Sequence, residues 1–221
     1  MSILKIARMG HPVLRRRAAD VADPGAPEIH ALVADMLETM LDAPGTGLAA
    51  PQVYASLRLV IFRVPLTDIE EMAGGEPTLT VLINPILEPL DDEMLTEWEG
   101  CLSLPGLRGL VPRHANLRYR GVDLAGAPID RTVKGFHARV VQHECDHLDG
   151  ILYPQRMTDL SDLIFETEMR HRIAESRAQE RAGERAQKRA QKRAQEPAQA
   201  PAQEGAAKEP AGKKPPPGAA T

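Results

Sequence analysis

The sequence predicts an α+β fold, and three observations lead to that prediction. An amphipathic helical pattern lies near the N-terminus, three strand-like segments follow without alternating with helices, and a second helical pattern lies close to residue 140. In a doubly wound α/β fold, strands and helices would instead alternate along the chain. The 221 residues suffice for one domain with an appendage, or for two small domains, and for a sizeable core.

Apolar residues recur at helical spacing between Ile29 and Leu41, which predicts the first helix. The stripe consists of Ile29, Leu32, Val33, Met36, Leu37, Met40 and Leu41. Pro24 and Pro27 precede it, and Pro44 with the glycine after it ends it.

Three short segments have the composition of β-strands: Leu59–Val64, Leu79–Asn84 and Asn116–Val122. In the last, apolar and basic side chains alternate, as in a strand with one buried face. We expect hairpin-like turns at Gly121, Gly126 and Pro128.

The second helix is predicted from Phe136 to Leu148, with Gly150 placed to cap its end. A further, solvated helix is predicted over Glu166–Gln195, because four-residue repeats of the RAQE type contain good helix formers but no large apolar residue. Pro197 ends any such helix, and we expect the remainder to be disordered.

The charge changes sign along the chain. From Glu175 onward there are 10 Lys and Arg against 6 Asp and Glu, whereas the first 174 residues carry 17 against 25. An acidic body argues against a nucleic-acid-binding core and leaves weak polyanion contact through the tail. We therefore expect a catalytic domain over residues 1–172 and a repetitive tail over residues 173–221, partly helical and then disordered.

The composition excludes several classes of protein. Two cysteines cannot form a disulfide framework, and no apolar run approaches the roughly 20 residues needed to span a bilayer. The N-terminus lacks the apolar stretch of a signal peptide. The expectation is a soluble cytoplasmic protein of bacterial type, with no targeting segment.

The strongest local motif is QHECDH in the second predicted helix. His143 and His147 are four residues apart, so both ring nitrogens can face one cation. Glu144 directly follows the first histidine, within reach of a water on such a cation. Two exposed histidines are the alternative interpretation, but apolar neighbours predict a buried helix, where unpartnered histidines would be costly.

A catalytic zinc-type centre needs a third protein ligand and one open position. The candidates are Cys101, Cys145, His114, His137, Glu166 and Glu168. Cys145 lies two residues from each histidine, so the helix directs it away from their face, and we predict a packed thiol. Cys101 lies in EGCLSLPG, which we interpret as a loop that can bring a thiolate and backbone amides close to a substrate; a small buried hydrophobe is the alternative.

A third segment, GTGLAAPQ, is rich in small residues and comes after the first helix as a loop. Small residues let another backbone approach closely, and the amide of Gln52 could donate to a developing oxyanion.

Taken in order, GTGLAAPQ, EGCLSLP and QHECDH resemble the three signature motifs of the peptide deformylases. The segment Gly10–Arg15 is similar to the N-terminal segment of that family, and Val111-Pro112-Arg113 is similar to the segment after its second motif. The resemblance covers roughly Ile3 to Arg170, and the repetitive tail has no counterpart in it.

The resemblance implies a metal held by Cys101, His143 and His147, with a fourth position for water. The implied ion is Fe(II), which Zn, Ni or Co can replace. Glu144 would be the general base, and the Gln52 amide with the backbone N–H of Leu102 would meet the oxyanion. With the resemblance, the full fold prediction is α+β with antiparallel or mixed sheets around a central helix that carries HExxH, plus a C-terminal helix and a disordered tail.

The implied substrate is the N-formyl-methionyl end of newly synthesised polypeptides, which releases formate. The resemblance places six substrate-binding residues at the pocket: Thr46, Gly47, Glu99, Arg108, Phe136 and Val140, with Glu97 and Trp98 near it. It also implies contact with the ribosome, and the basic tail is the candidate segment for binding ribosomal RNA. Neither DNA nor a membrane is expected as a partner.

Two rival functions remain at this point. In an HExxH zinc metallopeptidase, Glu166 or Glu168 would be the third ligand, but two of the three motifs would then be unexplained. In a non-enzymatic ribosome-binding module the tail would carry the function, although every motif residue that the chemistry needs is present.

Overall fold

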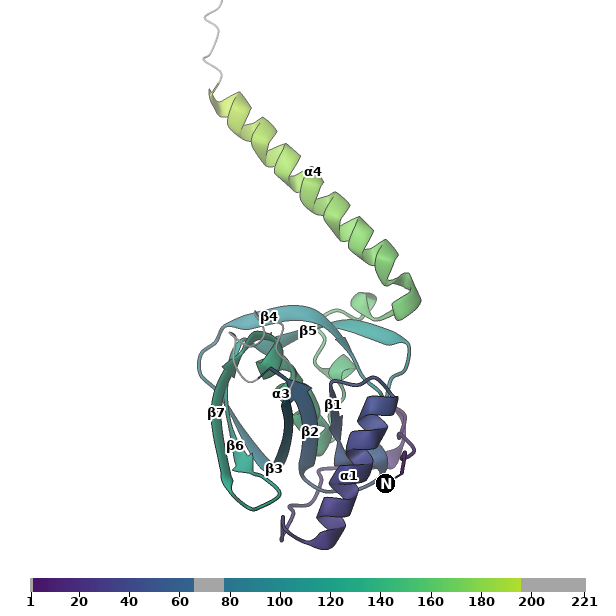
Figure 1. Ribbon diagram of the computed structural model, residues 1–221. Coiled ribbons are helices and arrows are strands. Elements are labelled where there is room, and N and C mark those ends of the chain that lie inside the picture. Colours follow the sequence, from purple (N-terminus) through teal and green to yellow (C-terminus); the bar gives the residue numbers. More distant parts are fainter. Residues whose placement is uncertain (1, 66–77, 196–221) are drawn as a thin grey trace, which may run out of the picture. The chain divides into compact units, whose positions relative to one another are not determined.

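The computed structural model describes residues 2–65 and 78–195 (Figure 1). The chain divides into two compact units, Met1–Arg172 and Ile173–Thr221, and each unit is described by itself. The segment beyond residue 195, for which the sequence predicts disorder, lies outside the described residues.

The strands of the first unit form two antiparallel sheets. The five-stranded sheet has the order β1-β2-β3-β6-β7: β1 Gly47–Ala49, β2 Leu59–Val64, β3 Thr78–Pro89, β6 Asn116–Val122 and β7 Pro128–Lys134. The three-stranded sheet has the order β4-β5-β8: β4 Met94–Gly100, β5 Leu107–His114 and β8 Ile164–Phe165. The prediction of an α+β fold with antiparallel sheets is therefore confirmed.

Two of the three predicted strands have the observed bounds, and the third is too short. Leu79–Asn84 is only the first half of β3, which continues to Pro89 across a register shift between Ile83 and Ile86. At this shift Asn84 has a φ of 51°, and its side chain bonds both backbone groups of Val21. The Asn84 side chain thereby ties the loop at Val21 to β3 at the point where the strand is irregular.

The three residues predicted to mark hairpin-like turns belong to one hairpin, β6–β7, in which Gly126 lies in the turn and Gly121 and Pro128 lie in the flanking strands. Gly126 has a φ of +75°, as a turn glycine should. Gly121 lies inside β6, where a Cβ would come within 2.7 Å of the Ile83 carbonyl oxygen, so the glycine allows close approach of β3. Pro128 begins β7, an edge strand, which tolerates a residue without an N–H.

The two segments interpreted as loops are partly regular. GTGLAAPQ contains β1 and the first three residues of a 3-10 turn, Ala50–Val53, and EGCLSLP begins with the last two residues of β4. Each strand is defined by its ladder partner, β2 for β1 and β5 for β4, and not by a local periodicity.

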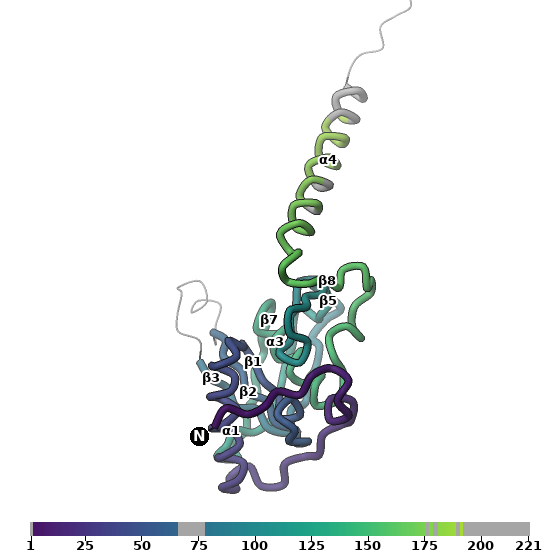
Figure 2. The backbone as a smooth tube through the Cα atoms, turned by 90° about the vertical axis from the view of Figure 1, so that its right-hand side faces the viewer, coloured from purple at the N-terminus to yellow at the C-terminus, as the bar shows by residue number. Residues whose placement is uncertain are grey.

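The helix α1, Pro27–Asp42, buries the predicted stripe against β1 and β2 (Figure 1). Leu41 is the exception, at 51% exposure. The N-terminal segment runs extended along the first unit (Figure 2), where Ala7 and Met9 donate to the carbonyls of Gln52 and Ser103.

The helix α3, Gly135–Leu148, is buried at every residue from His137 onward. It contacts β1, β2 and β7 of the five-stranded sheet and β5 of the three-stranded sheet. Gly150 follows with a φ of +72°, which confirms the predicted end of the helix. Half of this helix is polar, so its buried side chains need partners from other elements.

The helix α4, Met169–Gln195, follows a 3-10 turn at Glu166–Glu168 that the prediction had included in the helix. From Arg177 to Lys188, every side chain that the structure describes is exposed. Within the described residues, no helix combines the length and the apolar character that crossing a membrane requires.

Candidate metal centre and pocket

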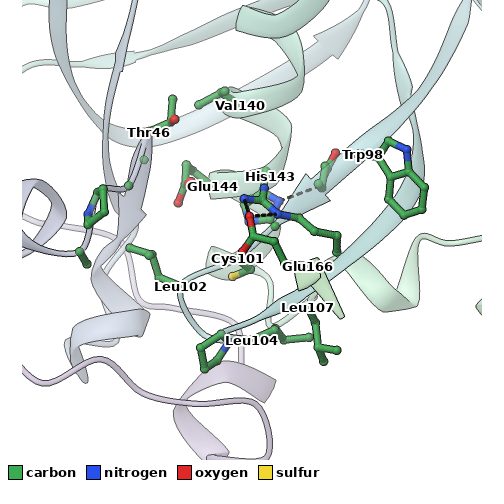
Figure 3. A pocket seen from close by; sticks show the side chains of 18 of the residues that line it. Thr46, Trp98, Cys101, Leu102, Leu104, Leu107, Val140, His143, Glu144 and Glu166 are labelled. Carbon is green, nitrogen blue, oxygen red and sulfur yellow. Dashed lines mark hydrogen bonds and ion pairs between the residues drawn. The ribbon is translucent and has the colours of Figure 1, made fainter. Parts of the chain in front are cut away.

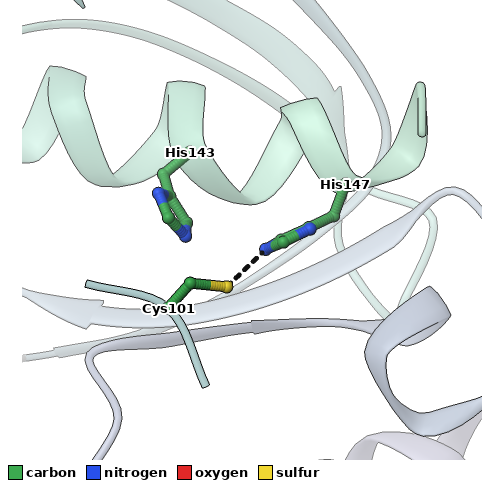
Figure 4. A group of neighbouring side chains, drawn as sticks. All are labelled: Cys101, His143 and His147. Atoms are coloured by element: carbon green, nitrogen blue, oxygen red, sulfur yellow. Dashed lines mark hydrogen bonds between the residues drawn. The ribbon is translucent and has the colours of Figure 1, made fainter. Parts of the chain in front are cut away.

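Cys101, His143 and His147 lie together, and their ligand atoms are all within 4.8 Å of one another (Figure 4). Cys101 directly follows β4, and the two histidines project from one face of α3. The Cys101 Sγ lies 3.3 Å from Nε2 of His147. A thiol and two imidazoles at this spacing form a group that could hold a metal ion.

The Cys101 thiol is acidic in this group. Burial would raise its pKa, but His147 and His143 lower it well below its usual value, which favours the thiolate form that binds metal ions. Thiolate and imidazole donors together match zinc and ferrous iron. The other thiol belongs to Cys145 of α3. It is buried in the hydrophobic core, and burial raises its pKa.

The remaining ligand candidates lie elsewhere. His137 packs between the rings of Phe62 and Tyr119, and the backbone of His114 pairs with Gln142. Among the described residues neither Glu166 nor Glu168 belongs to the Cys101 group.

Glu99 fixes the orientation of the His143 ring. Its Oε2 lies 2.7 Å from Nδ1 of His143, which leaves Nε2 of that ring for the Cys101 side. Burial would raise the pKa of Glu99, but hydrogen bonds from His143 and Arg113 lower it to about 2. The carboxylate also accepts a hydrogen bond from Arg139 at 2.7 Å, so it stays ionised behind the histidine.

A buried ion-pair network extends from Glu99 along α3. Arg113 of β5 donates to Glu99 at 2.9 and 3.0 Å and to Asp146 of α3. Arg156 donates to the other oxygen of Asp146 at 2.7 Å. Sequence reasoning missed this network, because the only local signal was the acidic residue between two histidines.

Glu144 lies buried beside the ligand group. Burial raises its pKa to about 7, against the lowering effect of His143 and His147. Its Oε2 has no hydrogen-bond partner within the described part of the chain. Any Cβ at Gly47 of β1 would collide with this carboxylate, so the glycine provides its place.

The side-chain amide of Gln52 is held beside the Cys101 thiol. Its Oε1 accepts a hydrogen bond from the Ala49 N–H at 2.9 Å, and its Nε2 donates to Ser103 Oγ at 3.1 Å. The same Nε2 lies 3.5 Å from Cys101 Sγ. Leu102 lies between Cys101 and Ser103, so its backbone N–H belongs to the same short segment.

These residues surround a pocket of about 520 Å³ (Figure 3). The structure places all six predicted substrate-binding residues in its lining, together with Trp98, Gln52, Leu102, Cys101, His143 and Glu144. His147 and Glu97 are not lining residues, and Glu97 pairs with Arg139 at 3.2 Å. Glu166, which sequence reasoning considered only as a metal ligand, also lines the pocket.

Comparisons with known proteins agree on one family. The family model described as polypeptide deformylase matches residues 3–162. Peptide deformylase 1 of Nitrosomonas europaea is 58% identical over 158 residues, which are 72% of this chain and 89% of that protein. Peptide deformylase 1 of Bordetella pertussis is 56% identical over 156 residues, 71% of this chain and 88% of that protein.

Solved structures give the same result. A class I type b peptide deformylase from Acinetobacter baumannii, bound to Met-Ala-Ser, has a TM-score of 0.65 and 37% identity and covers 71% of this chain and 100% of its own. Peptide deformylase from Thermotoga maritima has a TM-score of 0.64 and 31% identity, with coverage of 72% and 100%. The motifs, the fold and these relatives agree: the chain belongs to the polypeptide deformylase family of enzymes.

Proposed function

We propose that this enzyme hydrolyses the N-formyl group from the formyl-methionine of newly synthesised polypeptides, releasing formate, with the help of one divalent metal ion. The observation that carries the proposal is a Cys-His-His ligand group, two members of which line the pocket, beside the buried carboxyl group of Glu144, which lines it too. The relative bound to Met-Ala-Ser, a peptide with the sequence of a deformylated N-terminus, supports the choice of substrate.

Cys101, His143 and His147 would hold the ion, and the HExxH-bearing helix α3 would be the central element that positions two of them. The family implies Fe(II), and Zn, Ni or Co can substitute, since all of these accept thiolate and imidazole ligands. When bound, the ion supplies Lewis-acid polarisation of the formyl group.

Glu144 acts as the general base and then as the general acid. Its carboxylate accepts a proton from the attacking water and passes that proton to the amine that leaves. Burial raises the pKa of Glu144 above its usual value, which favours a carboxyl group that can take up a proton and release it again. Gly47 permits this position because it has no Cβ.

The tetrahedral oxyanion would be met by two hydrogen-bond donors, the Gln52 Nε2 and the Leu102 backbone N–H. The Ala49 N–H and Ser103 Oγ hold the Gln52 amide in place before substrate binds. Loss of one such donor typically costs about 3–4 kcal/mol in the transition state.

The methionine side chain would enter the apolar part of the pocket, between Val140, Phe136 and Thr46. β1 is an edge strand of its sheet, so Gly47 and its neighbour can pair with the extended peptide backbone. Arg108 would contact the peptide beyond methionine, and Glu99 would act by orienting His143.

The metallopeptidase alternative is not favoured, because Glu166 pairs with Arg108 and lies outside the ligand group found among the described residues. One experiment separates the two functions. The anaerobically prepared protein, with its metal measured, should release formate from formyl-Met-Ala-Ser, and Cys101→Ser should lose or retune its metal. A Cys101→Ser protein with unchanged metal content would contradict the proposed ligand set.

A further inference from the structure

Two charged side chains at the pocket, Arg108 and Glu166, differ from the other charged residues that line it. Arg108 is 37% and Glu166 is 54% exposed at the side chain, whereas Glu99, Arg139, His143 and Glu144 are buried. Among the described lining residues, these two charged side chains are therefore the ones that an entering peptide can contact at the surface.

The pair is well defined geometrically. Glu166 Oε1 accepts from Arg108 Nη2 at 2.6 Å and from Nε at 3.2 Å. The guanidinium lies over Gly100, where a Cβ would come within 2.6 Å of Nη1. Gly100 is opposite Arg108 in the β4–β5 ladder and directly precedes Cys101. The cation therefore lies next to the candidate metal group, and Figure 3 shows Glu166 among the side chains of that pocket.

The backbone holds the carboxylate in this place. β8 pairs with β5 through Arg108 and Ile164, and the Glu166 N–H donates to the Gly106 carbonyl at 2.8 Å. Glu166 lies beyond residues 3–162, the segment that the family model matches.

We propose that Glu166, by cancelling the charge of Arg108 at the pocket wall, sets the charge preference of the enzyme for the residues that follow formyl-methionine. The inference rests on the proposed deformylase function. An unpaired Arg108 would attract acidic side chains at those positions and repel basic ones. The paired guanidinium keeps its remaining N–H donors but presents no net charge, so acidic and basic peptides are accepted alike.

The test compares kcat/KM for formate release from formyl-Met-Asp-Ala, formyl-Met-Lys-Ala and formyl-Met-Ala-Ala. Glu166→Gln keeps an oxygen acceptor for Arg108 and removes only the charge. The ratio of interest is kcat/KM for the Asp peptide divided by kcat/KM for the Lys peptide. We expect Glu166→Gln to raise this ratio by about three- to tenfold, because the charge that it removes is half-exposed. Addition of 0.5 M salt should reduce the change. The double variant Arg108→Gln/Glu166→Gln should return the ratio to that of the parent.

The matched control is Asp130→Asn. Asp130 pairs with Arg118 at 2.7 Å with similar exposure, 49% and 41%, but neither lines the pocket. We expect this variant to leave the ratio unchanged.

Each other outcome overturns the proposal. If the parent releases formate but Glu166→Gln leaves the ratio unchanged, the charge of Glu166 does not act on the substrate. If Asp130→Asn shifts the ratio equally, the effect is not local to the pocket. If the double variant keeps the shift, Arg108 is not its source. If the parent releases no formate from any peptide, the proposed function itself fails and the inference fails with it.

Discussion

The helices α3 and α4 use similar residues in opposite ways. Both contain Arg, Glu, Gln and Ala, yet α3 is buried from His137 onward, while the described side chains of α4 from Arg177 to Lys188 are exposed. In α3 most of the polar groups meet partners from β4, β5 or the segment after the helix, as the Glu99 and Asp146 networks show. The four-residue repeat of α4 places like residues above one another without an apolar face. The difference shows that buried charge follows from partners supplied by distant segments, and composition alone does not predict it.

The same Glu→Gln substitution in each helix gives the largest expected contrast. Glu144→Gln should lower kcat for formate release by about 10²- to 10⁴-fold while the metal content stays unchanged, because the buried proton acceptor is lost. Glu184→Gln in α4, where the side chain is exposed, should leave kcat at the parental value. Formate release and metal content of both variants are the measurements. Equal turnover by Glu144→Gln and the parent would remove Glu144 from the mechanism.

Removal of an arginine should lower the free energy of unfolding where it pairs with α3 and leave it unchanged where it lies in α4. Arg113→Met leaves Glu99 and Asp146 buried without their shared cation, which should cost about 3–5 kcal/mol of unfolding free energy. Arg185→Met in α4 should cost almost nothing, because its side chain is exposed. Urea unfolding of the two variants measures both values. If Arg113→Met lowers the free energy of unfolding by less than about 1 kcal/mol, burial of Glu99 and Asp146 does not depend on this arginine.

A histidine near the start of α3 should make stability depend on pH. Burial lowers the pKa of His137 to about 4 against the partial compensation of the Pro65 carbonyl, while the unfolded value is 6.5. The unfolded chain therefore binds more protons between these values, so this contribution is complete above pH 6.5 and is lost as the pH falls toward 4. We expect His137→Gln to remove about 1–3 kcal/mol of that pH dependence.

The matched control is His171→Gln in α4, an exposed histidine, and unfolding free energies at about pH 4.5 and 7.5 give the comparison. The same pH dependence in His137→Gln and the parent would show that other groups are responsible.

Removal of the tail should have the smallest effect on catalysis. Truncation after Arg172 should leave kcat/KM for short formyl peptides within about twofold, because no α4 residue after that point lines the pocket within the described chain. If the basic repeat contacts ribosomal RNA, the truncated protein should co-sediment less with ribosomes at low salt, and raised salt should abolish the difference. Equal co-sedimentation would identify the tail as a spacer only.

The sequence by itself determined the features that depend on neighbours along the chain. The spacing of His143 and His147 put two imidazoles on one helical face, and the apolar stripe with its flanking prolines marked α1. Two strands and the end of α3 at Gly150 were also predictable, because alternation and a left-handed glycine are local signals. The three motifs were enough to indicate the family, which the comparisons then showed.

Only the tertiary structure decided which residues meet across long distances. It put Glu99 behind His143 and Arg113 against Asp146, neither of which follows from a periodic pattern, whereas the family resemblance had already implied Cys101 beside the two histidines. Strands β1, β4, β5, β7 and β8 were not predicted, and each is defined by its ladder partner, which for β4–β5 and β6–β7 is the neighbouring strand of a hairpin. The contact of Glu166 with Arg108 joins residues 58 positions apart. Periodicity records which face of an element is buried, whereas the partner on that face is chosen by packing of the whole chain.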